Sequence, residues 1–373
     1  MDQKKIVNKN ILIISPELWS DYYISKHNYA IHLAQKNNVW FLNSCGDASL
    51  SKKVDIEYFP ELNVKVVKYK NVIRGISKLP LPLLNILLKK QIKLIEKNIG
   101  TQLDIVWSFD PNRFWNLSYW NCTTRIYHPV DFHLKAKYQS ITCQTADVVL
   151  GIADLILDPI AKYNKHQFKI NHGVNLTNHS DDIKTVNLPG KNNLKISYLG
   201  NFHKSIDYQL LSLLVESNPT VDFILIGPYK GNALSSGNKI NKEVFEKLNS
   251  YENAYFIGEI PSTEIIPHLN SSDINLILFK EEKAVAHCNP HKTMSYLLSG
   301  KVIVSSYIDE YKNTDVLEME RFNKDINNRL KKVIDNIDFY NNKEHQTKRI
   351  EFAKSNSYNQ QIERIGTIIN QLQ

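Results

Sequence analysis

The 373-residue sequence is poor in cysteine, glycine and proline. It contains 4 cysteines, and no two of them are spaced as C-x-x-C, which excludes a zinc ribbon and a thioredoxin-like motif. A chain of this size does not need a disulfide framework to hold a core. With 13 glycines and 13 prolines, a collagen-like or linker-rich protein is also excluded.

Long hydrophobic runs are missing as well. No apolar run is long enough to span a bilayer, and the polar start MDQKKIVNKN does not resemble a signal peptide, so we expect a cytoplasmic protein. Hydrophobic residues make up 42% and charged residues 23%, which excludes wholesale disorder. The net charge of +8 mildly favours an anionic partner, such as a nucleic acid, an anionic membrane surface or a phosphorylated small molecule.

Several catalytic motifs are absent too. The sequence has no D-x-D for a metal-bound diphosphate, no G-x-x-x-x-G-K-[ST] and no G-x-G-x-x-G, so a metal site of that type, an ATPase and a dinucleotide-binding enzyme lack support. No G-x-S-x-G nucleophile elbow is present either. We therefore expect no metal and no cofactor.

Short β-branched runs alternate with longer amphipathic segments along the chain. Many of the runs are apolar throughout, which is typical of strands buried on both faces of a parallel sheet. The predicted strands are Ile11–Ser15, Val39–Asn43, Val64–Tyr69, Asp104–Phe109, Arg125–Val130, Val148–Ile152, Lys195–Gly200, Asp222–Gly227, Ala254–Gly258, Ile274–Phe279 and Val302–Ser306. Helical segments such as Tyr208–Glu216 complete β-α-β units. The polar segment Thr177–Asn193 predicts a boundary between two doubly wound α/β halves.

The segment Asn289–Ser306, NPHKTMSYLLSGKVIVSS, carries the strongest pattern. An Asn-Pro turn opens a predicted helix over Lys292–Ser299, Gly300 ends it, and a buried strand follows. A helix N-terminus can bind phosphate through free backbone N–H groups, and Lys292 would add a full positive charge there. A plain helix with a solvated lysine fits the spacing equally well.

This segment resembles the donor site of GT-B glycosyltransferases, in the retaining, polysaccharide-building bacterial group (family 4-like), whose usual form is near N-P-x-K-x-x-E-Y-L-A-x-G-K-P-V-V-S. Other segments are similar to the same group: Ser25–Ala30, Tyr127–Asp131, Asn171–Asn175, Ile196–Gly200, Phe223–Pro228, Tyr255–Pro261 and Ile274–Lys280. The resemblance implies an α/β GT-B fold, with two Rossmann-like doubly wound domains facing a central cleft. Residues 1–180 would bind the acceptor and 181–355 the nucleotide sugar. The apolar stripe in 356–373 would return that helix to the first domain.

The resemblance also implies a function. The protein would transfer a sugar from a nucleotide-diphosphate donor to the hydroxyl of a sugar or lipid-linked acceptor, without metal and with retention, in bacterial surface polysaccharide or glycoconjugate synthesis. Lys292 would stabilise the leaving diphosphate. The remaining donor-binding candidates are Gly200, Asn201, Gly227, Gly258, Glu259, Ile260, Asn289, Pro290, His291, Ser295 and Tyr296.

The sequence departs from the family pattern at Ser295, where the usual residue is Glu. That Glu typically holds the ribose hydroxyls, and a serine cannot supply its two charged acceptors. Some relatives carry a second Glu where this chain has His287. A weakened donor site, an unusual donor and a loss of activity are all compatible with these two changes.

Candidate acceptor-side residues follow the first-half strands. His128 and Asp131 lie at the end of a predicted strand, where ligands of α/β sheets bind, and a histidine that titrates near neutrality suits proton transfer. A structural histidine in a loop is the alternative. Glu17, Asp21 and His27 follow the first strand and are acceptor-side candidates, although a solvated or capping residue is the favoured interpretation of each one taken singly.

The segment Arg74–Asn98 mixes leucines and isoleucines with basic residues, namely Arg74, Lys78, Lys89, Lys90, Lys93 and Lys97. Such a stretch can lie on the inner face of the cell membrane, although a core-packed helix with a solvated basic face is the slightly favoured interpretation. Two further functions stay open. A non-catalytic binding protein on a decayed GT-B scaffold would explain Ser295, and a nucleic-acid-modifying glycosyltransferase would explain the charge, although the basic residues do not interleave with aromatics.

Overall fold

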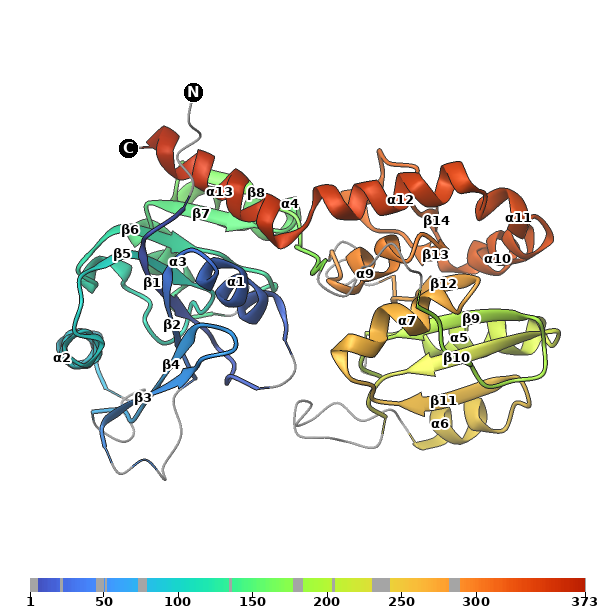
Figure 1. Ribbon diagram of the computed structural model, residues 1–373, viewed down its shortest axis with the longest axis horizontal. Helices are drawn as coiled ribbons and strands as arrows, with labels where there is room; N and C mark the ends of the chain where they lie inside the picture. The colour runs from blue at the N-terminus through green and yellow to red at the C-terminus, as the bar shows by residue number, and fades with distance from the viewer. Residues whose placement is uncertain are drawn as a thin grey trace. The chain divides into compact units, whose positions relative to one another are not determined.

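The structure is a computed structural model that describes residues 6–20, 23–44, 50, 52–72, 79–133, 136–176, 184–202, 205–229, 242–281 and 289–372. The chain divides into two compact units (Figure 1). The first unit comprises Met1–His172 and Tyr358–Gln373, and the second comprises Gly173–Ser357. The division thus falls between His172 and Gly173, whereas the sequence placed it after residue 180. Residues 177–183 of the expected linker lie outside the described residues.

The first unit is built on an eight-stranded sheet with the order β3-β4-β2-β1-β5-β6-β7-β8. Its strands are β1 (Asn10–Ile14), β2 (Asn38–Leu42), β3 (Val54–Phe59), β4 (Val64–Tyr69), β5 (Leu103–Ser108), β6 (Cys122–Tyr127), β7 (Val148–Gly151) and β8 (Gln167–Lys169). All neighbours pair in parallel except β3 and β4, which are antiparallel. Parallel pairing brings the carboxyl ends of β1, β5 and β6 to one edge of the sheet.

Helices cover both faces of this sheet. They are α1 (Ser25–Ala34), α2 (Leu81–Ile99), α3 (Gln139–Thr145), α4 (Asp154–Leu157) and α13 (Tyr358–Leu372), with short 3₁₀ helices at Leu117–Tyr119 and Asp158–Tyr163. Side chains of α1 and α13 share one hydrophobic core with the sheet, and those of α2 belong to the core on the other face. Tyr358, Ile365 and Ile369 of α13 are buried in the first of these cores.

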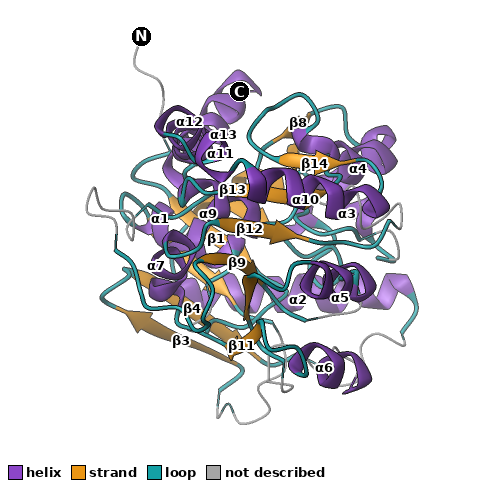
Figure 2. Cartoon of the chain, turned by 90° about the vertical axis from the view of Figure 1, so that its right-hand side faces the viewer, coloured by secondary structure: helices purple, strands orange, loops and turns teal. Residues whose placement is uncertain are grey.

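The second unit contains a six-stranded, wholly parallel sheet in the order β11-β10-β9-β12-β13-β14. Its strands are β9 (Leu194–Leu199), β10 (Val221–Ile226), β11 (Ala254–Gly258), β12 (Ile274–Ile277), β13 (Val302–Ser306) and β14 (Glu318–Glu320). Its helices are α5 (Tyr208–Ser217), α6 (Lys242–Asn249), α7 (Ile265–Asn270), α9 (Lys292–Leu298), α10 (Ile326–Asp335), α11 (Ile337–Tyr340) and α12 (Lys343–Ser355), with 3₁₀ helices at Ser262–Glu264, Asp309–Tyr311 and Asn323–Asp325. One hydrophobic core joins the sheet to α5, α6 and α10, and another joins it to α7, α9 and α12 (Figure 2).

The predicted fold class is confirmed, because each unit is a mixed α/β layer built on a mainly parallel sheet. Every predicted strand overlaps an observed one. Three strands were not predicted, namely β3, β8 and β14. Each lies at a sheet edge and has at most one buried residue, so it lacks the continuous apolar run that marks a central strand. Within the described part of the chain, no helix is both long and apolar enough to cross a membrane.

Candidate functional site

Three neighbouring strands of the second unit end in glycine. Gly200 follows β9 with φ of 141°, Gly227 follows β10 with φ of 138°, and Gly258 ends β11. The Gly200 amide donates to the carbonyl of Ile226 at 2.9 Å, and the Gly227 amide donates to the carbonyl of Gly258 at 2.7 Å. A Cβ on Gly227 would lie 2.1 Å from the Gly200 oxygen, so only glycine fits there. At their carboxyl ends, β9, β10 and β11 therefore present backbone without side chains. A flat or phosphorylated ligand can approach such backbone closely.

Lys292, the first residue of α9, lies beside these strand ends. Its Nζ is 3.9 Å from the centroid of the Tyr198 ring and 5.4 Å from that of Phe279. A Cβ built on Gly200 would be 3.5 Å from the same nitrogen. Ring faces attract an ammonium group but do not neutralise it. Lys292 thus presents a positive charge at the point where β9 ends.

The Lys292 ammonium has no carboxylate partner among the residues that the structure describes. Lys292 is half-buried, and the resulting desolvation lowers its pKa to about 7. A partly desolvated charge without a counter-ion is costly, and a bound anion would remove that cost. This arrangement suits a phosphate or diphosphate group.

The helix start itself contributes less than the sequence suggested. Helix α9 is only seven residues long, and its N-cap His291 has no side-chain capping bond. The amides of Thr293 and Met294 already donate to the carbonyls of Pro290 and His291. The positive charge at this position therefore comes from Lys292 rather than from free amides in the first turn.

Tyr296 fixes the place of α9. It is completely buried, and its hydroxyl oxygen accepts the amide of Leu199 at 2.6 Å. This bond ties the helix to the last residue of β9 and so holds Lys292 next to Gly200. Tyr296 is therefore a positioning residue. Asn289 is similarly buried and accepts a hydrogen bond from the Tyr311 hydroxyl at 3.1 Å.

The other donor-side candidates lie around the same strand ends. Ser295 is partly exposed on α9, and no described residue forms a hydrogen bond with its hydroxyl. Glu259 and Ile260 follow β11 and are half-buried, while Asn201 follows Gly200 and is exposed. His287, the second departure from the family pattern, lies outside the described residues.

In the first unit, charged side chains gather where β1 and β6 end. The ammonium of Lys26, at the start of α1, is 2.9 Å from Oε1 of Glu17 and 3.9 Å from Oδ2 of Asp131. The Lys26 side chain is 3% exposed, whereas those of Glu17 and Asp131 are 36% and 65% exposed. The buried Lys26 ammonium thus holds two carboxylates that are themselves open to solvent. We call Glu17, Lys26 and Asp131 the acceptor edge. Asp21 lies outside the described residues.

His128 does not support the expectation of a histidine that titrates near neutrality. Its ring is fully buried and stacked on Phe109 at 5.0 Å between centroids. Burial, assisted by the nearby Lys26 charge, lowers the pKa of His128 to about 3. The Trp107 indole N–H donates to its Nδ1 at 3.3 Å, so the proton of the neutral ring is on Nε2. His128 is therefore a neutral hydrogen-bond donor near neutral pH.

His27 is buried too. Its Nε2 bonds the carbonyl of Leu18 at 3.0 Å, its ring stacks on Phe41, and burial lowers its pKa to about 4. It holds the loop after β1 in place, and its role on the acceptor side stays a prediction.

Sequence reasoning missed several charged residues near this edge. Lys26 lies within the family-like segment Ser25–Ala30, but it was not singled out as a site residue. His133 follows Asp131, and its pKa is lowered mainly by burial, against the opposing effect of the Asp131 charge. Asp110 and Arg113 follow β5 and form an ion pair. A cue existed for all of them, because each lies just beyond the carboxyl end of a predicted strand or at the next helix start.

Comparison with known proteins identifies the class of fold. No protein-family model matches the sequence, and no curated protein matches it. Solved structures match over almost the whole chain, and they establish that the chain has the GT-B fold of glycosyltransferases.

Sucrose-phosphate synthase from Thermosynechococcus elongatus has a TM-score of 0.70 at 12% identity, covering 98% of this chain and 99% of that one. Anabaena HepE in complex with UDP-glucose has a TM-score of 0.66 at 13% identity, covering 96% and 99%. A trehalose-6-phosphate structure from E. coli, bound with UDP-2-fluoro glucose, has a TM-score of 0.67 at 10% identity, covering 97% and 98%. At these identities the likeness establishes the fold, and activity has to be argued from the site.

Proposed function

We propose that the protein is a glycosyltransferase that transfers a sugar from a nucleotide-diphosphate donor to an acceptor hydroxyl. The observation that carries the proposal is Lys292, a desolvated ammonium without a carboxylate partner among the described residues, beside three glycine strand ends. The GT-B neighbours crystallised with UDP-glucose or UDP-2-fluoro glucose support a nucleotide-sugar donor.

In this proposal the second unit binds the donor. The diphosphate contacts Lys292 and the backbone at Gly200 and Gly227, and the base lies beside Gly258–Ile260. Negative charge develops on the leaving diphosphate as the glycosidic bond breaks, and Lys292 stabilises it there. The positive charge is supplied by the chain itself, and on this ground we propose that transfer needs no metal.

The first unit would bind the acceptor at the acceptor edge. The exposed carboxylates of Glu17 and Asp131 can accept hydrogen bonds from sugar hydroxyls, and Lys26 orients both of them. His128 does not exchange a proton near pH 7 because its pKa is about 3. Because its ring is fully buried, His128 would support the acceptor edge through packing and would not contact the acceptor itself.

Retention at the anomeric carbon and a role in bacterial surface polysaccharide or glycoconjugate synthesis belong to the same proposal. Their support is the resemblance of 289–306 to the retaining, polysaccharide-building group. The anomeric configuration of the product, measured by NMR, tests retention directly. An inverted product would remove that part of the proposal and leave sugar transfer intact.

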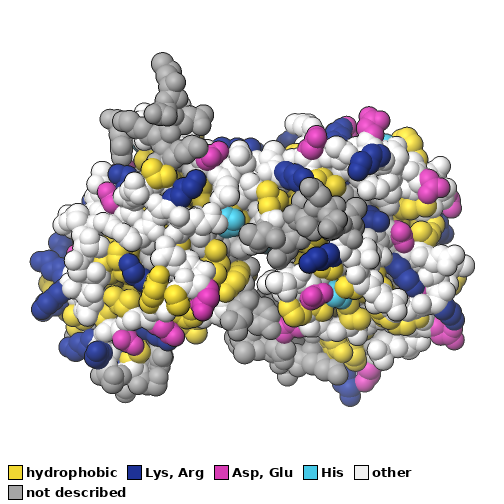
Figure 3. All heavy atoms as spheres, in the orientation of Figure 1, with side chains coloured by type: hydrophobic (Ala, Val, Ile, Leu, Met, Phe, Trp, Pro, Cys, Tyr) yellow, Lys and Arg dark blue, Asp and Glu magenta, His cyan; other side chains and the backbone are white. Residues whose placement is uncertain are grey.

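We also propose that the protein associates with the inner face of the cell membrane through helix α2. Five of its exposed residues recur every three or four positions and form a stripe, which we call the outer stripe: Leu83, Ile86, Lys90, Lys93 and Lys97. The first two are apolar and 49% and 52% exposed, and the other three are basic. In Figure 3, Lys and Arg side chains gather at the left edge, where Figure 1 places α2. Apolar and basic residues on one face suit an anionic lipid surface.

Vesicle sedimentation tests this association. The double variant Lys90→Gln, Lys93→Gln should bind anionic vesicles about 30-fold more weakly, at about 1 kcal/mol for each lysine. The matched control is Lys162→Gln, Lys165→Gln, which removes two exposed charges elsewhere in the same unit. Equal binding by both double variants would rule out the outer stripe as the membrane contact.

Donor turnover tests the proposed activity. Purified protein is incubated with a panel of nucleotide sugars, including UDP-glucose, and release of the nucleotide is measured with and without acceptors. We expect release with at least one donor, and its loss in Lys292→Met. Binding of a nucleotide sugar without any turnover would favour the non-catalytic scaffold that Ser295 leaves open.

A further inference from the structure

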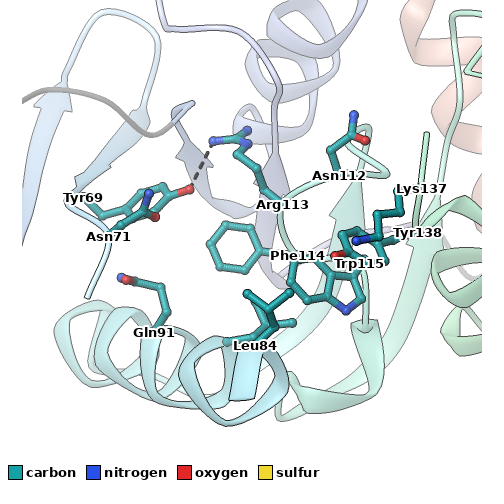
Figure 4. A pocket seen from close by; sticks show the side chains of 11 residues that line it. Tyr69, Asn71, Leu84, Gln91, Asn112, Arg113, Phe114, Trp115, Lys137 and Tyr138 are labelled. Atoms are coloured by element: carbon teal, nitrogen blue, oxygen red, sulfur yellow. Dashed lines mark hydrogen bonds between the residues drawn. The ribbon is translucent and has the colours of Figure 1, made fainter. Parts of the chain in front are cut away.

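The first unit contains a cavity of about 250 Å³ between helix α2, the end of β4 and the segments that follow β5 and β6 (Figure 4). Leu84 and Leu88 line it from α2, and Phe114 and Trp115 line it from the segment after β5. The Trp115 ring stacks on Tyr138 with their centroids 4.2 Å apart. Most of the lining is apolar, so water inside gains few hydrogen bonds and an apolar group can displace it.

Two buried side chains of the lining carry N–H groups without a partner within the described part of the chain, Gln91 and Trp115. Gln91 is 4% exposed, and its Oε1 accepts the amide of Val72 at 2.9 Å, which leaves Nε2 as the free end. Trp115 is 7% exposed. Unpaired buried donors are costly and uncommon in folded proteins. Both N–H groups are shielded from solvent, so a ligand oxygen would reach them only if the two side chains turned toward the cavity.

The rim of the cavity is basic. Lys137 is exposed, and its Nζ lies 5.1 Å from the centroid of the Tyr138 ring. It forms no ion pair with any carboxylate in the described part of the chain. An apolar interior with an unpaired ammonium at its rim complements an amphipathic ligand that has an anionic end.

One lining residue, Arg113, connects the cavity to polar groups that follow β1 and β5. Arg113 lines it, donates to the hydroxyl of Tyr69 at 3.2 Å and forms an ion pair with Asp110. Arg113 also donates to the carbonyl of Ser15, and the Ser15 hydroxyl donates to the carbonyl of Glu17. A chain held in the cavity would therefore have its polar end on the side of the unit where Glu17 lies.

We propose that this cavity binds the apolar chain of the acceptor, and that the chain is linked to the rest of the acceptor through a phosphate ester that meets Lys137. The identification of the ligand as the acceptor rests on the proposed function. The binding of an apolar ligand chain in this cavity does not depend on it. The volume is just below the roughly 300–1,000 Å³ of pockets that enclose whole ligands, so the cavity suits one part of a larger molecule.

Calorimetric titration of the full chain without nucleotide sugar tests the proposal. The probes are decyl phosphate, dodecyl phosphate and farnesyl phosphate, each below its critical micelle concentration, with inorganic phosphate as the head group alone. We expect saturable binding of the chain-bearing probes and at least tenfold weaker binding of inorganic phosphate. Each methylene buried in the cavity should tighten binding about fourfold. Stronger binding of farnesyl than of dodecyl phosphate would assign an isoprenoid chain, and the reverse would assign an acyl-type chain.

Variants locate the binding site. Asn71→Trp places a large ring at the exposed rim and should weaken binding of the favoured probe at least tenfold. Asn98→Trp is the matched control on the exposed face of α2 and should bind as the wild type does. Lys137→Gln should weaken phosphate-bearing probes severalfold while leaving dodecyl glucoside unchanged.

The proposal is overturned if no chain-bearing probe binds saturably, or if Asn71→Trp binds as tightly as the control. Nucleotide-sugar turnover is measured separately on the wild-type protein. Saturable chain binding without turnover would refute the proposed activity and leave the cavity as a binding site. Turnover without chain binding would refute the cavity proposal alone.

Discussion

We predict that the substitution Lys292→Met has opposite effects on the two properties: it raises stability and weakens donor binding. Methionine keeps the length and apolar stem of lysine and removes the charge. In the folded protein burial lowers the pKa of Lys292 from 10.5 to about 7. Between these values the unfolded chain binds more protons than the folded one, so stability rises with pH across this range. Below pH 7 the full cost of the buried charge is present, so we expect the variant to be more stable than the wild type at pH 6.

The stability gain should shrink as the pH rises from 7 toward 10, because the wild-type lysine must release a proton on folding in this range, and that release costs less as the pH approaches 10.5. Differential scanning fluorimetry across this range measures it. The matched control is Lys301→Met, which removes a charge just beyond the other end of α9. A destabilised Lys292→Met variant at pH 6 would mean that the ammonium has a counter-ion and that the reasoning is wrong.

Donor binding by the wild-type protein should weaken as the pH rises, in contrast to its stability. With a pKa of about 7, the protonated fraction of Lys292 falls from about 0.9 at pH 6 to about 0.1 at pH 8, so the affinity for a nucleoside diphosphate should fall about tenfold. Lys292→Met should lose this dependence, and it should also lose about 3 kcal/mol of transition-state stabilisation, a factor of 100 or more in kcat/KM. Titrations with UDP, GDP, CDP and ADP at pH 6 and pH 8 measure these affinities in the wild type and in the variant. An unchanged pH dependence in the variant would refute the role of Lys292.

Three further predictions concern other parts of the two units. Gly227→Ala should lower the free energy of unfolding by about 2 to 4 kcal/mol, whereas Gly100→Ala, which has open space around it, should cost about 1 kcal/mol; urea unfolding compares the two. Ser295→Glu should lower the donor KM about tenfold if the ribose pocket follows the family pattern, and a rise in KM would show a rebuilt pocket. Because the pKa of His128 is lowered to about 3, the free energy of unfolding should fall as the pH drops from 6.5 toward 4, and His128→Asn should reduce this slope.

Much of the fold could be predicted from apolar runs. Strands such as β10, with all six residues buried, are apolar enough to be recognised in the sequence. Strand β3 was not predicted, because it is an antiparallel edge strand with a single buried residue. The seven-residue α9 was predicted nearly in full from its Asn-Pro start and Gly300 end. The division at His172 came earlier than expected because Val174 and Leu176 pack into a core of the second unit.

The candidate site was only partly predictable. The sequence indicated Lys292 and the glycines at the strand ends. It could not show that the ammonium lacks a carboxylate partner among the described residues, because pairing depends on residues far apart in the chain. Lys26 shows the same limit. Its burial between Glu17 and Asp131 joins segments that follow two different strands.

The sequence alone determined the α/β class, the order of the strands along the chain and the residues that lie at strand ends. Each of these follows from local pattern, because apolar runs, turn residues and helix boundaries are set by neighbours in the chain. Only the tertiary structure decided the protonation of His128, the lowered pKa of Lys292 and the cavity under α2. Desolvation and cavity formation depend on which segments pack around a group, and that is settled when the whole unit has folded.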